Sequence, residues 1–362
     1  MDFGLSEDQL LLEQTLRSFL SDRVPIERVR ELRDADCPND RAIWDSLAEL
    51  GAAGVLVPEA QGGSGLGLLD AALVSEALGH AVAPTPFLAS SVMAPVALGA
   101  VSGSEACDWL AGIASGEQVF GVAATELFSV REDAGVSLKA GVLDGKAMLA
   151  IDACRADFLL VALDSETFAV VEVAAPGLEI TRLRTVDATR CTAEAVFEGV
   201  APKAVFEAAG SAIARMLDAG RIALAADTLG AAESMLEQSV AYAKERKQFE
   251  RLIGSFQAVK HMCAEMVAEL EPARSFLWYA AHSFDAIPTE APLMACQVLA
   301  HISEIAREIA SISTQVHGGI GWTDEQNLHF WFKRIGNARH LLGGPESLRE
   351  RAAELEGFAA TA

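Results

Sequence analysis

The sequence QVHGGIGWT at residues 315–323 decides the fold of this chain. A second stretch, ERKQF at residues 245–249, lies roughly 70 residues earlier and is followed by FQ at residues 256–257. Together they place a cation, several amides, aromatic rings and adjacent glycines in two short segments. Arginine pairs strongly with a diphosphate, and glycine lets backbone approach a ligand closely. The two segments therefore indicate a site for a phosphate-bearing cofactor.

Each segment also has a purely structural interpretation. Arg246 can form a surface ion pair with Glu245 or Glu250. The pair Gly318-Gly319 can simply end a helix. Both segments together, at a spacing that resembles that of the acyl-CoA dehydrogenase family, favour the cofactor interpretation over either structural one.

The sequence divides into three parts that differ in the spacing of their apolar residues and turns. Residues 1–115 read as helical, beginning with a capping box of Ser6 and Gln9 that precedes a leucine stripe at helical spacing. Residues 116–207 carry short apolar runs separated by Asp-Gly, Asp-Ser and Pro-Gly turns, which predicts a small antiparallel β domain. Residues 208–362 return to long Ala-rich helices, and the segment 221–242 is apolar on most faces, as in a bundle. We therefore predict an α+β protein.

Composition limits the classes of partner. The chain has 362 residues, enough for two or three domains, and a net charge of −23. Such a polyanion disfavours nucleic acid and anionic membranes as partners. No segment has the roughly 20 apolar residues of a membrane span, and the start, Met1-Asp2-Phe3-Gly4, lacks the features of a signal peptide. We expect a cytoplasmic, oligomeric protein.

The cysteines and histidines give no sign of a metal site. The six cysteines stand singly, at positions 37, 107, 154, 191, 263 and 296, and the seven histidines are equally scattered. Neither shows the spacing of zinc ligands. Reduced thiols in a cytosolic protein are the expectation.

The two segments and the order of helices, sheet and helices resemble the acyl-CoA dehydrogenase family, over the whole length of the chain. The resemblance implies an N-terminal helical domain (1–115), a middle β domain (116–207) and a C-terminal four-helix bundle (208–362). It also implies FAD as cofactor. In this family the isoalloxazine lies against its own subunit, whereas the neighbouring subunit holds the ADP half. The residues that would serve a neighbour are Arg246, Gln248, Phe249, Phe256, Gln257, Gln315, Gly318 and Gly319. Glu250 departs from the glycine usual in the family.

The residues that would hold this subunit's own flavin differ from the family pattern. Residues 125–131 read TELFSVR, without the glycines of the similar family segment. Leu149-Ala150-Ile151 stands where the family has Trp-x-Thr beside the flavin. The flat tryptophan ring and the threonine hydroxyl that this family segment places beside the flavin are therefore both absent here.

The catalytic base is also missing. The family's two positions for a glutamate base fall on Gly343 and Gly220, and glycine cannot transfer a proton. Glu346 and Asp218 stand nearby, either as displaced bases or as ordinary cap and surface acids. Asp218 and Arg221 match the family's Asp-x-x-Arg near the acyl-CoA, although Arg221 can equally be a structural cation in the bundle.

This pattern resembles the base-lacking subunit of the α2β2 acyl-CoA dehydrogenases of actinobacterial steroid side-chain degradation. The resemblance implies an acyl-CoA substrate, a second subunit that carries the base, and electron-transfer flavoprotein as acceptor. Two alternatives stay open: a homomeric flavoenzyme with a displaced base, and a flavin-free scaffold.

Overall fold

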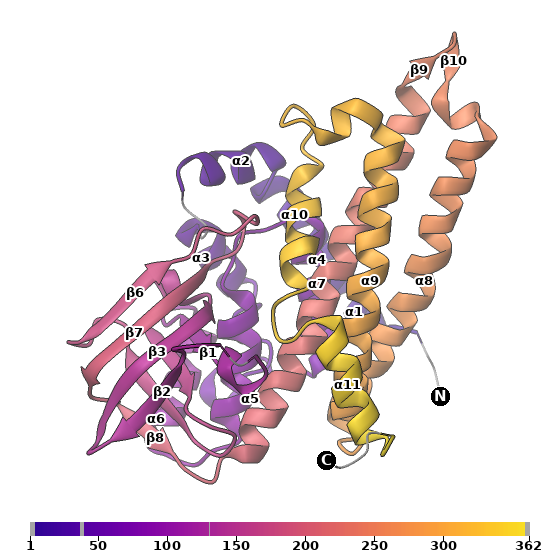
Figure 1. Cartoon of the computed structure of the whole chain (residues 1–362). Helices are drawn as coiled ribbons and strands as arrows, with labels where there is room; N and C mark the ends of the chain where they lie inside the picture. Colours follow the sequence, from indigo (N-terminus) through magenta and orange to yellow (C-terminus); the bar gives the residue numbers. More distant parts are fainter. Residues whose placement is uncertain (1–3, 37–39, 130, 359–362) are drawn as a thin grey trace.

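The computed structural model describes residues 4–36, 40–129 and 131–358, so the N-terminal Met1–Phe3, Cys37 and Val130 lie outside it. Figure 1 shows a twisted sheet at one side, a bundle of long helices at the other, and N-terminal helices that lie between and behind them. The predicted α+β fold is confirmed.

The N-terminal helices begin as the sequence predicts. The Ser6 hydroxyl accepts the N–H of Gln9 at 3.2 Å, and the Gln9 side chain accepts the N–H of Ser6 at 3.0 Å, which completes the capping box. The first helix then buries Leu16 and Leu20 in the core. The helices are α1 (Glu7–Arg23), α2 (Ile26–Asp34), α3 (Arg41–Glu49), α4 (Leu68–His80), α5 (Ala94–Gly99) and α6 (Ser104–Ala114).

The middle of the chain forms an eight-stranded sheet. Its order is β6-β7-β3-β1-β4-β5-β8, with β2 paired to β3 off this path. All neighbours are antiparallel except β1 and β4, which run parallel. The strands are β1 (Phe120–Ala123), β2 (Gly135–Lys139), β3 (Val142–Ile151), β4 (Phe158–Ala162), β5 (Phe168–Glu172), β6 (Leu178–Arg182), β7 (Thr192–Val200) and β8 (Ala204–Phe206).

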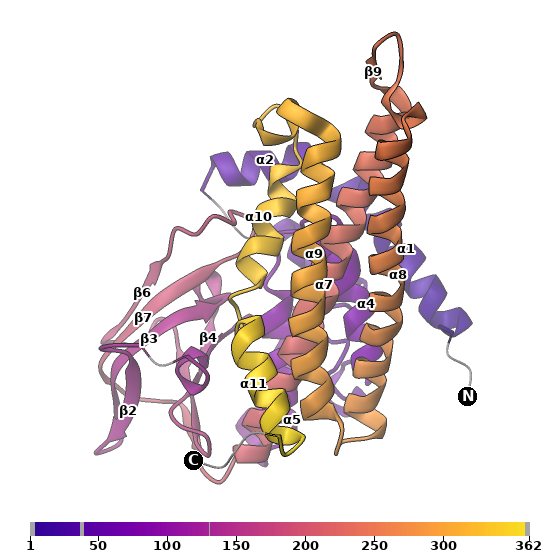
Figure 2. The same ribbon diagram turned by 45° about the vertical axis from the view of Figure 1, so that its right-hand side comes forward.

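The C-terminal helices are built around one long central helix. This helix, α7, is buried along most of its length and packs against α4, α8, α9 and α10. Figures 1 and 2 show it running from the sheet end of the molecule to a hairpin at the opposite tip. None of the helices within the described ranges is long and apolar enough to cross a membrane. The elements are α7 (Gly210–Glu245), β9 (Lys247–Gln248), β10 (Arg251–Leu252), α8 (Gln257–Ala286), α9 (Ala291–His317), α10 (His329–Ala338) and α11 (Pro345–Leu355).

A buried ionic cluster joins the sheet to the bundle. Asp227 of α7 accepts two hydrogen bonds from Arg334 of α10, at 2.9 and 2.6 Å, and pairs with Arg190 from the loop before β7 at 2.6 Å. Arg334 also donates to the hydroxyl of Thr189 at 2.8 Å. Burial opposes ionisation of Asp227, but the two guanidinium groups hold its pKa below the ordinary value. Breaking such a buried cluster on one side typically costs about 3–5 kcal/mol.

Two of the cysteines are paired, which corrects the prediction of reduced thiols. Cys154 and Cys191 form a disulfide, with their Cα atoms 6.1 Å apart. The antiparallel pairing of Ile151 with Thr192 brings them together, although they are 37 residues apart in sequence. Cys107, Cys263 and Cys296 are free. Because the partners meet only across β3 and β7, their spacing in the sequence could not reveal them.

The free energy of unfolding should depend on pH through the buried carboxyl group of Asp152. Burial raises the pKa of Asp152 to about 6. The charge of Arg190 and the Ala89 N–H, which donates to the Asp152 carboxylate at 3.1 Å, offset part of this rise. The folded state therefore binds this proton more tightly than the unfolded state, and stability falls as pH rises from about 4 to 6. We expect Asp152→Asn to remove this fall, a relative gain of up to about 3 kcal/mol above pH 6.

Urea unfolding of both proteins between pH 4 and 7 measures the effect. The exposed Asp108→Asn is the matched control and should follow the wild-type profile. If Asp152→Asn also parallels wild type over this range, Asp152 does not titrate as a buried group.

Candidate active site

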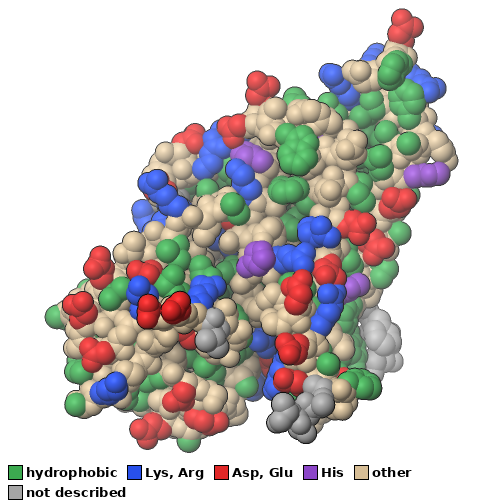
Figure 3. Space-filling view, in the orientation of Figure 1, with side chains coloured by type: hydrophobic (Ala, Val, Ile, Leu, Met, Phe, Trp, Pro, Cys, Tyr) green, Lys and Arg blue, Asp and Glu red, His purple; other side chains and the backbone are tan. Residues whose placement is uncertain are grey.

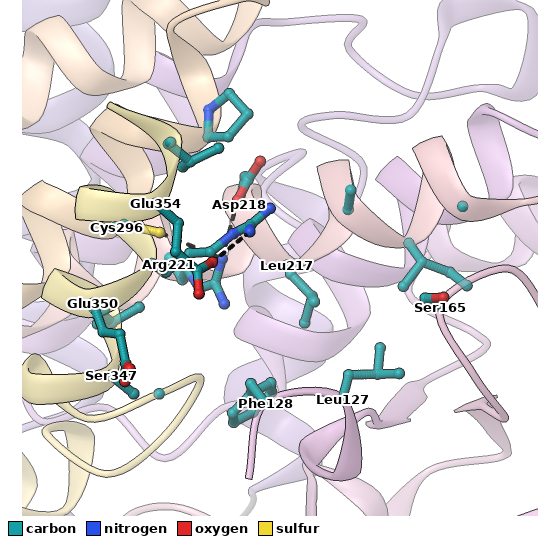
Figure 4. A pocket seen from close by; sticks show the side chains of 18 residues that line it. Leu127, Phe128, Ser165, Leu217, Asp218, Arg221, Cys296, Ser347, Glu350 and Glu354 are labelled. Carbon is teal, nitrogen blue, oxygen red and sulfur yellow. Dashed lines mark hydrogen bonds and ion pairs between the residues drawn. The ribbon is translucent and has the colours of Figure 1, made fainter. Parts of the chain in front are cut away.

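A cavity of about 500 Å³ opens between α7, α9, α11 and the loop after β1. Asp218 and Arg221 of α7 line it, as do Leu127, Phe128 and Gly343 (Figure 4). The structure thus brings together the two predicted substrate residues, one of the two base positions, and the loop that differs from the flavin-binding pattern. Their roles toward a substrate stay predictions.

The space for a base at position 220 is filled by other side chains. A Cβ atom added to Gly220 would lie 3.0 Å from the Leu342 Cδ1 atom and 3.0 Å from Met93. Both of these side chains are buried. A carboxylate could therefore not be placed here without repacking the core. The sequence predicts that this position lacks a base but gives no sign that Leu342 and Met93 lie against it.

The other base position is held in an unusual backbone conformation. Gly343 has φ +105°, which L-amino acids with a side chain rarely adopt, and Leu342 before it has φ +57°. Arg221 donates from Nε to the Leu342 carbonyl at 3.2 Å and from Nη1 to Asp218 at 3.2 Å. This guanidinium therefore fixes the turn that carries Gly343, which supports its structural interpretation.

The two candidate displaced bases have different surroundings. Glu346 is exposed, pairs with Arg339 at 3.1 Å and is not among the residues that line the cavity. Asp218 is buried on the cavity wall. Burial raises the pKa of Asp218, and Arg221 offsets part of that rise. Of the two, only Asp218 faces the cavity.

The β domain offers little to an isoalloxazine ring in this chain. Leu149 lies at a bulge in β3 with φ +52°, and Ala150 and Ile151 are buried in the core. Glu126 uses its carboxylate to accept the N–H of Met148 at 2.8 Å. None of the three residues 149–151 presents a hydroxyl or a flat ring, so the residues at this site do not fit the isoalloxazine half of FAD.

The predicted nucleotide residues lie at the far end of α7. Arg246 is the C-cap of that helix, Gln248 is in β9, and Phe249 is at the turn with 87% of its surface exposed. Phe256 meets the Phe249 ring edge-on at 6.2 Å, and Gln257 begins α8.

The hairpin turn keeps a backbone shape typical of glycine. Phe249 and Glu250 have φ +51° and +62°, as the two central residues of a type I′ hairpin turn require. The chain thus keeps this turn although Glu250 is not a glycine.

The second nucleotide segment packs beside the first. His317, the last residue of α9, stacks on Tyr242 of α7 with the ring centroids 4.7 Å apart. Val316, Ala243 and Ile253 form a small apolar cluster below this pair. Gln315 is exposed at the end of α9, and Gly318 and Gly319 follow in a 3₁₀ turn (Gly318–Trp322). Side chains added at either glycine would meet open space, so the backbone there is accessible.

The tip has a local charge opposite to that of the whole chain. Lys and Arg side chains gather around β9 and β10 (Figure 3). In the part of the chain that the structure describes, Arg246, Lys247 and Arg251 form no ion pair; Arg251 instead lies 3.9 Å from the Phe256 ring centroid. The surface pairing of Arg246 with Glu245 or Glu250 is therefore not seen. An unpaired cation beside amides and exposed rings fits the diphosphate half of FAD.

The cavity and the predicted nucleotide residues at the tip cannot meet within one chain. Gly220 and the last residue of α7 are 25 residues apart on one continuous helix. At a rise of 1.5 Å per residue, the stretch between them is about 38 Å long. No cluster of three or more metal-ligating side chains occurs in the described ranges either.

Comparison with known proteins identifies the family. Residues 6–117 match the acyl-CoA dehydrogenase N-terminal domain and residues 210–355 match its C-terminal domain. Acyl-CoA dehydrogenase IpdE2 of Mycolicibacterium smegmatis is 32% identical over 97% of this chain and 100% of its own length. The chain belongs to the acyl-CoA dehydrogenase family.

Two solved structures of similar proteins are heteromeric by their names. The ChsE4-ChsE5 complex from Mycobacterium tuberculosis has a TM-score of 0.91 and 25% identity, and the match covers 100% of both chains. A variant of the Tcur3481-Tcur3483 steroid ACAD has a TM-score of 0.87 and 29% identity, over 98% of this chain and 99% of the other. The resemblance to the actinobacterial steroid-type members is therefore confirmed.

The filled space at position 220 generates a prediction. Gly220→Ala should destabilise the protein by roughly 1–3 kcal/mol, because its methyl group would press on Leu342 and Met93. Gly336→Ala in α10 is the matched control, since a Cβ there meets nothing within 4 Å and alanine favours helix. Denaturant midpoints of the two variants measure the difference. Equal stability of both would show that the space beside Gly220 is not tightly packed.

Proposed function

We propose that this chain is the non-base-bearing subunit of a heteromeric FAD-dependent acyl-CoA dehydrogenase. The observation that carries the proposal is the division of its site. The residues suited to the ADP half of FAD lie at the tip, about 38 Å along α7 from Gly220, whereas Gly343, the other predicted base position, lines the cavity. What this chain offers at the tip can serve only a site completed by another subunit.

The reaction explains why a second subunit is needed. Desaturation of an acyl-CoA removes an α-proton to a carboxylate, and FAD, when bound, takes up the β-hydride. This chain has no carboxylate at 220 or 343, and Leu342 and Met93 fill the first of these places. Without a base and without a seat for the isoalloxazine, the cavity in this subunit binds no reacting thioester. The partner subunit supplies both.

At the tip, this chain contributes binding and orientation. Arg246 would neutralise the diphosphate, and the side-chain amides of Gln248, Gln257 and Gln315 would donate hydrogen bonds. The rings of Phe249 and Phe256 would exclude water from one side, while Gly318 and Gly319 leave their backbone open to a ligand. Because the cation has no carboxylate partner within the described ranges, no ion pair must break when the diphosphate arrives.

The substrate class and partners follow from the relatives. The name of one similar structure contains the words steroid ACAD, which supports a steroid side-chain thioester as substrate. An α2β2 assembly with a base-bearing acyl-CoA dehydrogenase, in the cytoplasm, and electron-transfer flavoprotein as acceptor complete the proposal.

One observation favours a second candidate. Asp218 is a buried carboxyl group on the cavity wall with a raised pKa, as a base in a homomeric enzyme would be. In that case the isolated chain should be yellow and active, and Asp218→Asn should abolish the activity. The ion pair of Asp218 with Arg221, which fixes the Leu342 carbonyl, favours the structural role instead.

Expression alone and with the adjacent acyl-CoA dehydrogenase gene product tests the proposal. The isolated chain should be colourless and inactive, whereas the co-expressed complex should absorb at about 450 nm, as bound flavins do. Activity of the complex should exceed any activity of the chain alone by at least about 10²-fold, the contribution of a general base. Yellow, active isolated chain would favour the homomer, and a colourless complex would favour a flavin-free scaffold.

Arg246→Ala should weaken FAD binding by the complex. Loss of one charge-assisted contact costs roughly 1.5–3 kcal/mol, which corresponds to about a 10- to 150-fold higher Kd. Lys139→Ala removes one exposed charge from β2 and should leave the Kd unchanged. Flavin fluorescence on dilution of the assembled complex measures both. An unchanged Kd for Arg246→Ala would mean that Arg246 does not hold the diphosphate, which would contradict the function proposed for the tip.

A further inference from the structure

The Gly318–Trp322 turn has little packing of its own. Gly321 is its buried residue, whereas Ile320 is 37% exposed and Trp322 is 76% exposed. Gly318 and Gly319 have open space where side chains would be. A segment with so few buried contacts cannot hold its position by itself. Its position must be set by the anchors at its two ends.

The anchor before the turn is His317. Its ring stacks on Tyr242, and its Nδ1 lies 2.8 Å from the Ser313 carbonyl oxygen. This anchor belongs to the bundle and ties the start of the turn to α7.

The anchor after the turn is Asp324, which α2 holds from the N-terminal domain. Arg30 donates to the Asp324 carboxylate at 2.7 Å, to the Asp324 backbone carbonyl at 2.7 Å, and to the Asn327 side chain at 2.5 Å. Arg33 donates to both carboxylate oxygens, at 2.5 and 3.4 Å. His329 adds a contact to the same carboxylate at 2.8 Å. Hydrogen bonds from the two arginines hold the pKa of Asp324 well below its usual range.

The geometry distinguishes this anchor from an ordinary surface ion pair. A single exposed pair contributes little, because both side chains stay mobile. Here two planar guanidinium groups lie beside the Phe330 ring, at 5.7 and 5.2 Å from its centroid, and one of them also binds a backbone carbonyl. Several hydrogen bonds in fixed directions determine orientation as well as attraction.

The helix that carries these arginines is itself fixed. Val29 and Leu32 are buried in the main core. At the end of α2, Asp36 binds Arg182 of β6 through its carboxylate and its carbonyl oxygen. In Figure 1, α2 lies across the ends of β6 and α10. It therefore connects the sheet, the N-terminal helices and the turn.

We propose that α2 is a strap that positions the nucleotide-binding turn, and that Asp324 is a positioning residue for FAD through its bonds to Arg30 and Arg33. The inference rests on the proposed function of the tip. It assigns a role in cofactor binding to residues that would not touch the cofactor. Loss of the strap releases one end of the Gly318–Trp322 turn, so the turn samples other positions and binds FAD more weakly.

The test uses the assembled heteromer and FAD itself as the probe. Asp324→Ala should raise the Kd for FAD about 10-fold, within the range by which residues that do not touch a ligand change its binding. The melting temperature of the flavin-free complex should change little, since Asp324 is 60% exposed. Asp324→Glu should recover most of the affinity. Arg28→Ala is the matched control, because Arg28 lies on the same helix but pairs with Asp40 and Glu31 instead.

A double-mutant cycle identifies the strap as the cause. Arg30→Ala with Arg33→Ala should weaken FAD binding as much as Asp324→Ala does, and combining all three changes should cause no further loss. A Kd for FAD that is unchanged in Asp324→Ala while Arg246→Ala weakens binding would overturn the strap and leave the proposed function standing. If Arg246→Ala also has no effect, the proposed function itself fails. A lowered melting temperature with an unchanged Kd would assign α2 a role in stability alone.

Discussion

The buried carboxylate of Asp227 is the interaction on which the rest of the structure depends. It accepts hydrogen bonds from Arg334 in α10 and pairs with Arg190 beside the sheet, all at or below 2.9 Å. Because all three groups are almost completely removed from water, each charge depends on the others, and losing one leaves an unpaired buried charge. The cluster therefore fixes the β domain and α10 against the middle of α7.

A second constraint comes from α7 itself. A continuous helix of 36 residues acts as a rigid spacer, so whatever lies at its two ends stays apart. Here the two ends carry the exposed residues predicted to bind the nucleotide, at the tip, and a cavity lined by Asp218 and Arg221, toward the other end. Under the proposed function, the residues at the tip would therefore hold a cofactor only at an interface with another subunit.

The surroundings of the two glycines at the predicted base positions also leave little room for a side chain. At position 220 the free space has been taken by Leu342 and Met93, and the turn at Gly343 is held by Arg221 in a backbone conformation that disfavours a side chain. Returning a carboxylate to either place would require repacking the core or distorting that turn. This arrangement gives Arg221 and Leu342 a structural role in the interior of this chain.

The sequence by itself indicated the family and the order of helices and sheet, because these depend on local periodicity and on short motifs such as QVHGGIGWT; the assignment of Gly220 and Gly343 to the base positions stays a prediction. Ser6 with Gln9 shows the same point, since a capping box is complete within four residues. Tertiary structure alone decided which distant groups meet. Three contacts join residues that are far apart in the chain: the Cys154–Cys191 disulfide, the packing of Leu342 beside Gly220, and the hydrogen bonds from α2 to Asp324. Such contacts leave no periodic trace in a sequence, because the folded backbone alone brings their partners together.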